Sequence, residues 1–355
     1  MPYLDLSKIS LPKDEADYNT WADYIELFCL LEADRSLSVE AIKDRLVDEC
    51  GGDEDIALKQ ITGVKKALSI TPPRDRIADD QLDSDVIDPE NDQRIRTAII
   101  DIITYLKGRY SAIPEFYPFR IDNHNNITAN KPLSNENKIY VILLISSLIR
   151  IITRTGGFAY RITHFFEQLC EYPFRVLVPD SANVHFFGAG GYIQESGTPA
   201  IEGSFYKKVL ELASRLNLQI HPIFNPIEAG NNNNGDGGLD WIAYMPFEDG
   251  LSSMPTFFAQ CACGNDWEDK QFDAHKDKWR NFILFINDVT NYHFIPKSFR
   301  NITSRWQKET SIANVVLIDR FRLIELIHKS QREIDIIALY DDVLNEIENT
   351  TVDFN

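Results

Sequence analysis

The sequence has little positive charge, few cysteines and no long hydrophobic run. Its 355 residues include 36 Lys+Arg against 54 Asp+Glu, which leaves a formal net charge of −18 at pH 7. Non-specific binding of nucleic acid needs clustered lysine and arginine to neutralise phosphates. The composition therefore argues against a uniformly basic nucleic-acid binder, although it leaves room for a local basic groove on an acidic protein.

The five cysteines form an odd set without any CxxC pair. This pattern predicts a reducing compartment, with neither a disulfide framework nor a structural zinc site. The longest apolar run, residues 139–149, has 11 residues and is interrupted by Ser146 and Ser147. A membrane span needs about 20 apolar residues, so we predict a buried helix here and no membrane association. Residues 1–30 lack a basic start followed by an apolar run, which predicts a cytoplasmic protein.

Helical periodicity dominates the first half of the chain. Apolar residues spaced by three to four in residues 17–31 predict one helix, and Ser38 is the expected N-cap of a second. Further helices are expected over residues 56–68, 94–106, 139–152 and 160–169. Between Asp75 and Asp92, eight acidic residues stand against one basic residue. We interpret residues 74–93 as a solvated linker; the alternative is an acidic segment that mimics DNA or masks a basic groove.

Strands and helices alternate in the last third of the chain. Strands are expected over residues 218–224, 239–245, 256–263, 292–295 and 314–318, and helices over residues 201–216 and 334–347. The alternation predicts a mixed sheet flanked by helices, so the whole chain is expected to be an α+β protein with an all-α N-terminal region. The expected parts are a helical N-terminal domain, a helical connector, a mixed-sheet domain and a C-terminal helix, at residues 1–125, 126–189, 190–330 and 331–355.

The passage that carries chemistry is the glycine-rich turn Gly235–Asp240, followed by the predicted strand that contains Gln260. If the two strands pair as a hairpin, Asp240 and Gln260 meet at one end. A carboxylate beside an amide oxygen is a suitable ligand pair for Mg²⁺ or Mn²⁺, which can hold a phosphate and activate water. The alternative is a glycine-rich hairpin in which Asp240 caps a turn and Gln260 lies on a polar face.

The sequence GDGGLD at residues 235–240, followed by FFAQ at residues 257–260, resembles the restriction-endonuclease-like PD-(D/E)xK nucleases, and among them the Mrr-like branch whose second motif reads QxK. The likeness covers about residues 190–330 and includes the later strand VVLID at residues 315–319. It implies a metal-dependent endonuclease that cleaves DNA, usually in defence against foreign DNA. The metal ligands that it implies are Asp240, Gln260 and the backbone carbonyl of Cys261, with assistance from Glu202 or, as a rival, Glu167.

One position departs from that family, because Ala262 stands where the lysine of QxK is expected. Either a lysine reaches the site from elsewhere or the domain binds without cutting. Lys270 is the nearest downstream candidate, and Lys276 and Lys278 follow on a predicted helix. Each of these lysines is equally explained as part of a solvated helix face.

A DNA contact surface is expected where basic residues alternate with aromatics, at Lys297, Arg300, Arg305 and Lys308. The same residues are also typical of a solvated helix, and Lys207 with Lys208 forms a second candidate patch. The expected partners are DNA and, through the helical N-terminal half, a second copy or another subunit. Two other functions stay open: a catalytically degenerate docking module of a defence complex, and a nuclease that acts on RNA.

Overall fold

The computed structural model describes residues 9–12, 16–62, 89–152, 156–188, 198–225 and 235–349. The chain divides into two compact units. The first unit comprises residues 1–155, 300–306 and 341–355, and the second comprises residues 156–299 and 307–340. Residues 74–88 of the predicted linker lie outside the described residues. Residues 89–93 are helical instead, because the helix Pro89–Ala112 begins there. The predicted division into four parts stays a prediction.

Helices form most of the first unit, as predicted. They are α1 (Tyr18–Leu31), α2 (Val39–Glu49), α3 (Glu54–Thr62), α4 (Pro89–Ala112), α5 (Asn135–Ser147), α6 (Ile149–Ile152) and α14 (Asp341–Asn349). Ser38 caps α2 as predicted, because its hydroxyl accepts the amide N–H of Ala41. Among the described helices, none combines the length and the apolar character that crossing a bilayer requires.

A small antiparallel sheet also belongs to this unit, which the prediction of an all-α region missed. Its strands are β1 (Ser36–Leu37), β2 (Phe119–Ile121) and β3 (Ile127–Ala129), in the order β1-β3-β2. Segments of two or three residues are too short to show the alternation by which a strand is recognised in a sequence. Nearby, the buried Arg109 of α4 donates to Asp23 at 2.6 Å and to Glu26 at 2.8 Å, which ties α4 to α1.

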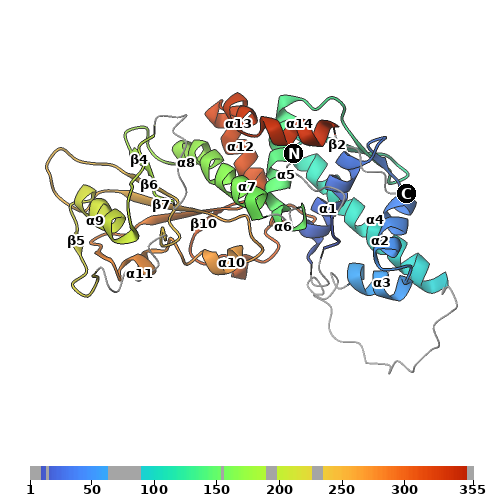
Figure 1. The fold of residues 1–355 in the computed structure, drawn as a ribbon, viewed down its shortest axis with the longest axis horizontal. Coiled ribbons are helices and arrows are strands. Elements are labelled where there is room, and N and C mark those ends of the chain that lie inside the picture. Colours follow the sequence, from blue (N-terminus) through green and yellow to red (C-terminus); the bar gives the residue numbers. More distant parts are fainter. Residues whose placement is uncertain are drawn as a thin grey trace, which may run out of the picture. The chain divides into compact units, whose positions relative to one another are not determined.

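The second unit is built on a mixed sheet of five strands (Figure 1). In spatial order these are β10 (Val316–Ile318), β9 (Thr290–Phe294), β7 (Thr256–Cys261), β6 (Trp241–Tyr244) and β4 (Asn183–Phe186). The strands β7, β9 and β10 are parallel to one another, and β6 is antiparallel to both of its neighbours. Four of the five predicted strands are confirmed here. The fifth, β5 (Gln219–Ile220), pairs instead with β8 (Ile283–Leu284) outside the main sheet.

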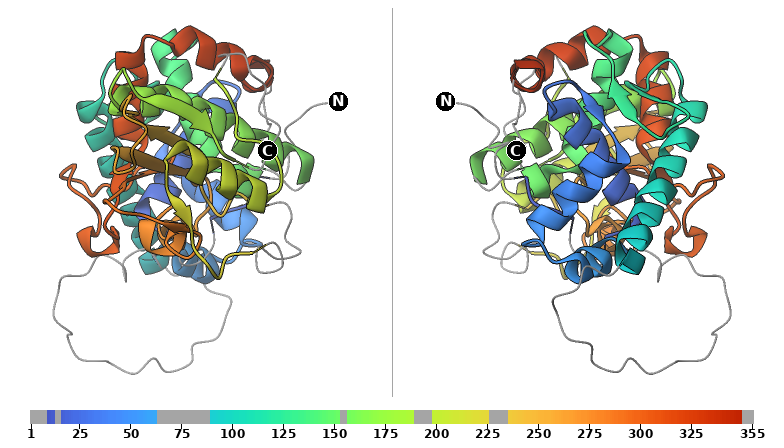
Figure 2. Two further views of the ribbon diagram at one scale, coloured as in Figure 1. Left: turned by 90° about the vertical axis from the view of Figure 1, so that its left-hand side faces the viewer. Right: turned by 90° about the vertical axis from the view of Figure 1, so that its right-hand side faces the viewer.

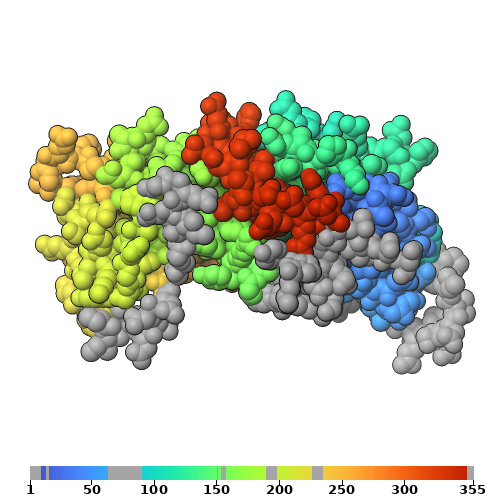
Figure 3. Space-filling view, turned by 45° about the horizontal axis from the view of Figure 1, so that its top comes forward, coloured from blue at the N-terminus to red at the C-terminus, as the bar shows by residue number. Residues whose placement is uncertain are grey.

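Helices cover both faces of this sheet (Figures 1 and 2). One face carries α7 (Gly156–Leu169), α8 (Glu171–Leu177), α12 (Arg320–Ser330) and α13 (Glu333–Leu339), and the other carries α9 (Phe205–Arg215), α10 (Trp267–Lys270) and α11 (Lys276–Trp279). The short helix η3 (Glu309–Ser311) precedes β10. Alternation along β6 and β7 sends Ile242 and Phe258 into the apolar cluster around α9. The outer face of α9 forms part of the surface seen in yellow in Figure 3.

Candidate functional site

The glycine-rich turn before β6 is held in a conformation that only glycine adopts easily. Gly237 and Gly238 have φ angles of +67° and +78°. The Asp236 carboxylate accepts the N–H of Gly238 at 2.7 Å, and Lys278 Nζ donates to the Gly237 carbonyl at 2.8 Å. A Cβ on Gly238 would lie 2.2 Å from the Cβ of Asp273. The turn is therefore tightly packed, and its hydrogen bonds fix the backbone position from which Asp240 leads into β6.

Replacing Gly238 by alanine tests how strictly this turn is built. The positive φ and the clash with Asp273 together should lower the free energy of unfolding by about 2–4 kcal/mol. Gly250 is the matched control, because it has a φ of +66° and a Cβ added there would meet nothing within 4 Å. Gly250→Ala should cost about 1 kcal/mol. Chemical denaturation measures both, and equal losses would show that the packing against Asp273 does not matter.

Asp240 and Gln260 lie at the same edge of the sheet, as the hairpin hypothesis requires. Trp241 pairs with Ala259, and the N–H of Asp240 donates to the Ala259 carbonyl at 3.0 Å. The Asp240 Oδ2 atom accepts the N–H of Cys261 at 2.7 Å. The Gln260 amide nitrogen donates to the carbonyls of Gly238 at 2.9 Å and Lys270 at 2.8 Å. Each side chain is thus oriented by backbone groups of the turn, of β7 or of α10.

These bonds use Oδ2 of Asp240 and the amide nitrogen of Gln260, so one oxygen atom of each side chain remains for another partner. Asp240 Oδ1 and Gln260 Oε1 make no hydrogen bond to the described part of the chain. Both side chains are largely buried, at 5% and 6% exposure. Within the described ranges, no group of three or more His, Cys, Asp or Glu is arranged to hold a metal ion. The pair here is of another kind, a carboxylate with an amide, and its oxygens are of the class that Mg²⁺ takes.

Negative charge accumulates at Asp240. Burial raises the pKa of the Asp240 carboxyl well above its usual value, and the charges of Glu167 and Asp236 raise it further. The N–H of Cys261 and the charge of Lys270 lower this pKa, but they do not offset the rise. A buried carboxylate with two acidic neighbours is an environment that a bound cation stabilises.

Of the two glutamates named for this site, Glu167, the rival in the sequence interpretation, is the one whose charge raises the Asp240 pKa. The indole N–H of Trp241 donates to the Glu167 carbonyl at 2.7 Å and so docks α7 beside the start of β6. Glu202 is exposed in the loop before α9, and its charge acts on Lys208 and is not among the causes of the shifted Asp240 pKa. The family resemblance favoured Glu202, which stands just before the helix that precedes these strands. The proximity of Glu167 arises only when α7 packs beside the start of β6.

Lys208 supplies a buried positive charge that the sequence interpretation assigned to a DNA-contact patch. Its Nζ donates to the carbonyls of Phe187 and Gly188, each at 2.7 Å, and only 6% of the residue is exposed. The N–H groups of the same two residues donate to the Asp240 carbonyl. Burial lowers the pKa of Lys208, while Asp236, Asp240 and Glu202 raise it. Lys208 lies on the apolar face of α9 with Phe205 and Leu212. A lysine at an apolar position of this helix was the feature of the sequence that could have indicated a buried charge.

The three lysines proposed as substitutes for the missing family lysine are placed differently. Lys270 ends α10, is partly exposed and acts on the Asp240 charge. Lys278 binds the glycine turn and Asp273, at 2.8 and 2.7 Å. Lys276 pairs with Asp288 at the opposite end of the parallel strands. Cys261 and Cys263 are buried, and burial raises the pKa of both thiols well above the usual value.

The four residues expected to contact DNA do not form a helix. Lys297 and Lys308 belong to the second unit, whereas Arg300 and Arg305 belong to the first. The Lys297 side chain is buried and donates to Asn265 at 2.8 Å, while Arg305 and Lys308 are exposed. A DNA-binding role for these residues stays a prediction.

A buried histidine also lies next to the site. His293 pairs with Gln260 across β7 and β9, and burial lowers its pKa to about 3. It is therefore neutral at physiological pH and does not compete with Lys208 or Lys270 as a source of positive charge.

Comparison with family models, with curated proteins and with solved structures found no match to this chain.

Proposed function

We propose that the second unit is a Mg²⁺- or Mn²⁺-dependent endonuclease that hydrolyses phosphodiester bonds in DNA. The observation that carries the proposal is the shared position of Asp240 and Gln260 at one sheet edge, each oriented by backbone hydrogen bonds with one oxygen left over. The resemblance to the PD-(D/E)xK nucleases supports the choice of reaction. Defence against foreign DNA, a cytoplasmic location and a second copy or subunit on the helical unit are part of the same proposal.

The donor set determines how a cation would be held. Asp240 Oδ1 and Gln260 Oε1 would be the side-chain ligands, the carbonyl of Cys261 would be the backbone ligand, and the charge of Glu167 would add to that of Asp240. When bound, the ion supplies charge to stabilise a phosphate and to acidify a water molecule. Asp240 and Glu167 hold the negative charge that attracts the ion. Lys208 supplies an ammonium group, which Ala262 does not, at the backbone of residues 187 and 188.

Plasmid cleavage tests this proposal. The purified chain is incubated with supercoiled DNA and Mg²⁺ or Mn²⁺, in parallel with Asp240→Asn. We expect nicked or linear DNA from the wild type only, and none in EDTA. Cleavage that persists in Asp240→Asn would come from a contaminant, and the absence of cleavage with supercoiled, linear and single-stranded DNA would overturn the proposal.

A docking module without catalysis is the second candidate function, and Ala262 with the net charge of −18 favours it. A module that docks DNA would retard the plasmid in a gel without cutting it, and a module that docks another protein would neither retard nor cut it. A labelled RNA of matching length, added as a further substrate, separates a deoxyribonuclease from a nuclease directed at RNA.

The two acidic candidates can be separated by paired variants. Glu167→Gln should slow cleavage by about 10²-fold, because Glu167 adds to the negative field at Asp240. Glu202→Gln should change the rate less than about threefold, because Glu202 is exposed and acts on Lys208. Initial rates at saturating Mg²⁺ measure both effects. A larger loss of rate in Glu202→Gln than in Glu167→Gln would instead support Glu202, the residue that the family resemblance implies.

A further inference from the structure

A second polar pocket lies at the edge of the sheet opposite to Asp240 and Gln260. Its volume is about 450 Å³, and it is lined by the first residues of β9 and β10 and by the start of α11. Gln260 is near the end of β7, and β9 runs parallel to β7, so the beginning of β9 faces away from the candidate nuclease site. An adjoining hollow of about 380 Å³ shares His275 and Asn314 with it. Nothing in the proposed nuclease chemistry uses this pocket.

Asn291 presents an unsatisfied acceptor in this pocket. The residue is 7% exposed, and its amide nitrogen donates to the Val289 carbonyl at 3.3 Å. The amide oxygen Oδ1 is buried and has no hydrogen-bond partner within the described chain. A buried polar atom without a partner destabilises a fold, because no hydrogen bond offsets the free energy that its removal from water costs. The bond to Val289 fixes which end of the amide is the nitrogen, so Oδ1 is the atom that would accept a donor from a ligand or from the water that a ligand displaces.

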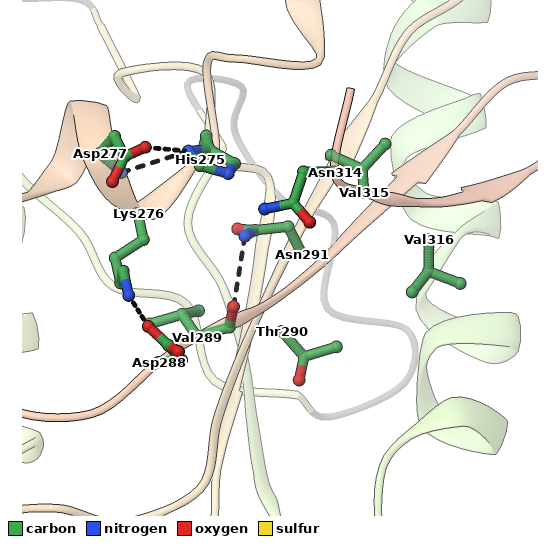
Figure 4. A pocket seen from close by; sticks show the side chains of 10 residues that line it. All are labelled: His275, Lys276, Asp277, Asp288, Val289, Thr290, Asn291, Asn314, Val315 and Val316. Carbon is green, nitrogen blue, oxygen red and sulfur yellow. Dashed lines mark hydrogen bonds and ion pairs between the residues drawn. The ribbon is translucent and has the colours of Figure 1, made fainter. Parts of the chain in front are cut away.

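Two more polar side chains converge on the same space. His275 caps α11, and its Nδ1 accepts the N–H of Asp277 at 3.3 Å, which leaves Nε2 as the ring nitrogen that can donate. Asn314 is exposed in a left-handed conformation with φ of 51°, and its amide makes no hydrogen bond to the described residues. Figure 4 shows the amides of Asn291 and Asn314 close together near the His275 ring. The pocket thus offers an acceptor from Asn291, a donor from His275, and both kinds of group from Asn314.

The charges of the pocket are internally paired. Lys276 forms an ion pair with Asp288 (Figure 4), and Asp277 forms one with Arg280 at 3.5 Å. A polar but nearly neutral lining favours an uncharged planar ligand that donates and accepts on one edge. The adenine edge has this pattern, with an amino group beside a ring nitrogen, and it is the base edge that asparagine recognises by paired hydrogen bonds. Valine side chains at residues 289, 315 and 316 supply apolar contact for the ring.

We propose that this pocket binds an adenine base through the amides of Asn291 and Asn314. The amino group donates to Asn291 Oδ1, and a ring nitrogen accepts from the Asn314 amide. The same base can arrive as a free adenine nucleotide or within single-stranded nucleic acid. The proposal does not rest on nuclease activity, because binding is measured without cleavage.

Calorimetric titration of the full chain with adenosine, AMP and inosine in EDTA tests the proposal. Inosine has an oxygen in place of the amino group and a hydrogen on N1, so position 6 can no longer donate to Asn291 Oδ1 and N1 can no longer accept from the Asn314 amide. We expect adenosine and AMP to bind at least about tenfold more tightly than inosine. A single-stranded oligo(dA), compared with oligo(dT) of the same length, distinguishes a base in a strand from a free nucleotide. Equal affinity for adenosine and inosine, or no binding of adenosine, AMP or oligo(dA), would overturn the proposal.

Two variants and a matched control locate the binding. Asn291→Leu removes the unpartnered oxygen at similar volume, so it should abolish adenosine binding while the melting temperature is unchanged or higher. Asn314→Gly keeps the left-handed backbone and should weaken binding at least about tenfold. Asn217→Gly is the control, because Asn217 has the same φ of 51° and does not line the pocket. Adenosine binding that survives both pocket variants would place the ligand elsewhere and refute the assignment.

Discussion

Asp240→Asn is expected to lower Mg²⁺-dependent DNA cleavage by about 10³-fold or more, and at the same time to raise the melting temperature at pH 8. The amide oxygen can still accept the N–H of Cys261, so the local geometry is kept. What disappears is a buried negative charge that lies near Glu167 and Asp236. Loss of activity with gain of stability is the signature of a charge retained for function.

The pH dependence of stability provides a separate measurement. Because the folded state binds the Asp240 proton more tightly than the unfolded chain does, the free energy of unfolding should fall as pH rises above the ordinary pKa of 3.8. Asp240→Asn removes this contribution, so its advantage over the wild type should be absent near pH 3 and should grow toward pH 8. Thermal denaturation at a series of pH values measures it. A constant difference at all pH values would mean that the Asp240 charge is not destabilising.

Added Mg²⁺ should reverse the order of the two proteins. A cation that binds only the folded state stabilises it by mass action, and the Asp240 carboxylate is the expected ligand. At pH 8, Mg²⁺ should raise the melting temperature of the wild type and leave Asp240→Asn unchanged. Asp249→Asn, in an exposed turn, is the control for an effect of any lost carboxylate. An equal Mg²⁺ effect on all three proteins would argue against a metal at Asp240.

Lys208→Met should give the second-largest loss, about 10²-fold or more in the cleavage rate. The thioether fills the apolar face of α9 but leaves the carbonyls of Phe187 and Gly188 without their donor, at a cost of about 1–3 kcal/mol of stability. Lys207→Met, one residue earlier and exposed, should change the rate and the stability little. Cleavage rates at a temperature where both variants are folded make the comparison.

The metal dependence of Lys208→Met distinguishes an electrostatic role from a structural one. Removing a positive charge near Asp240 should leave the Mg²⁺ concentration for half-maximal activity unchanged or lower it, because the ion meets less repulsion. A collapsed site would need more Mg²⁺ instead. A slower enzyme with a raised Mg²⁺ requirement would therefore reduce Lys208 to a structural residue.

Local patterns along the chain were enough to predict most elements. Ser38 as an N-cap, the apolar periodicity of α1 and the strand at Thr256–Cys261 are encoded within a few residues, because capping and periodicity depend on near neighbours. The pairing of Asp240 with Gln260 was also predictable, since two consecutive strands that pair antiparallel place the start of the first beside the end of the second. The two-residue strands and the separate β5–β8 pair were not, because their partners are distant in the sequence.

By itself, the sequence determined the α+β class, the glycine turn and the pair of residues at its sheet edge. Only the tertiary structure decided which charges surround that pair. It brings Glu167 from α7 to Asp240 and places Lys208 of α9 near it, while Lys270, which the sequence had suggested, also acts on Asp240. It also placed Asn291 and Asn314 in one pocket. The physical reason is that electrostatic and hydrogen-bonding environments depend on distances in space, which a chain acquires only when its helices pack on the sheet.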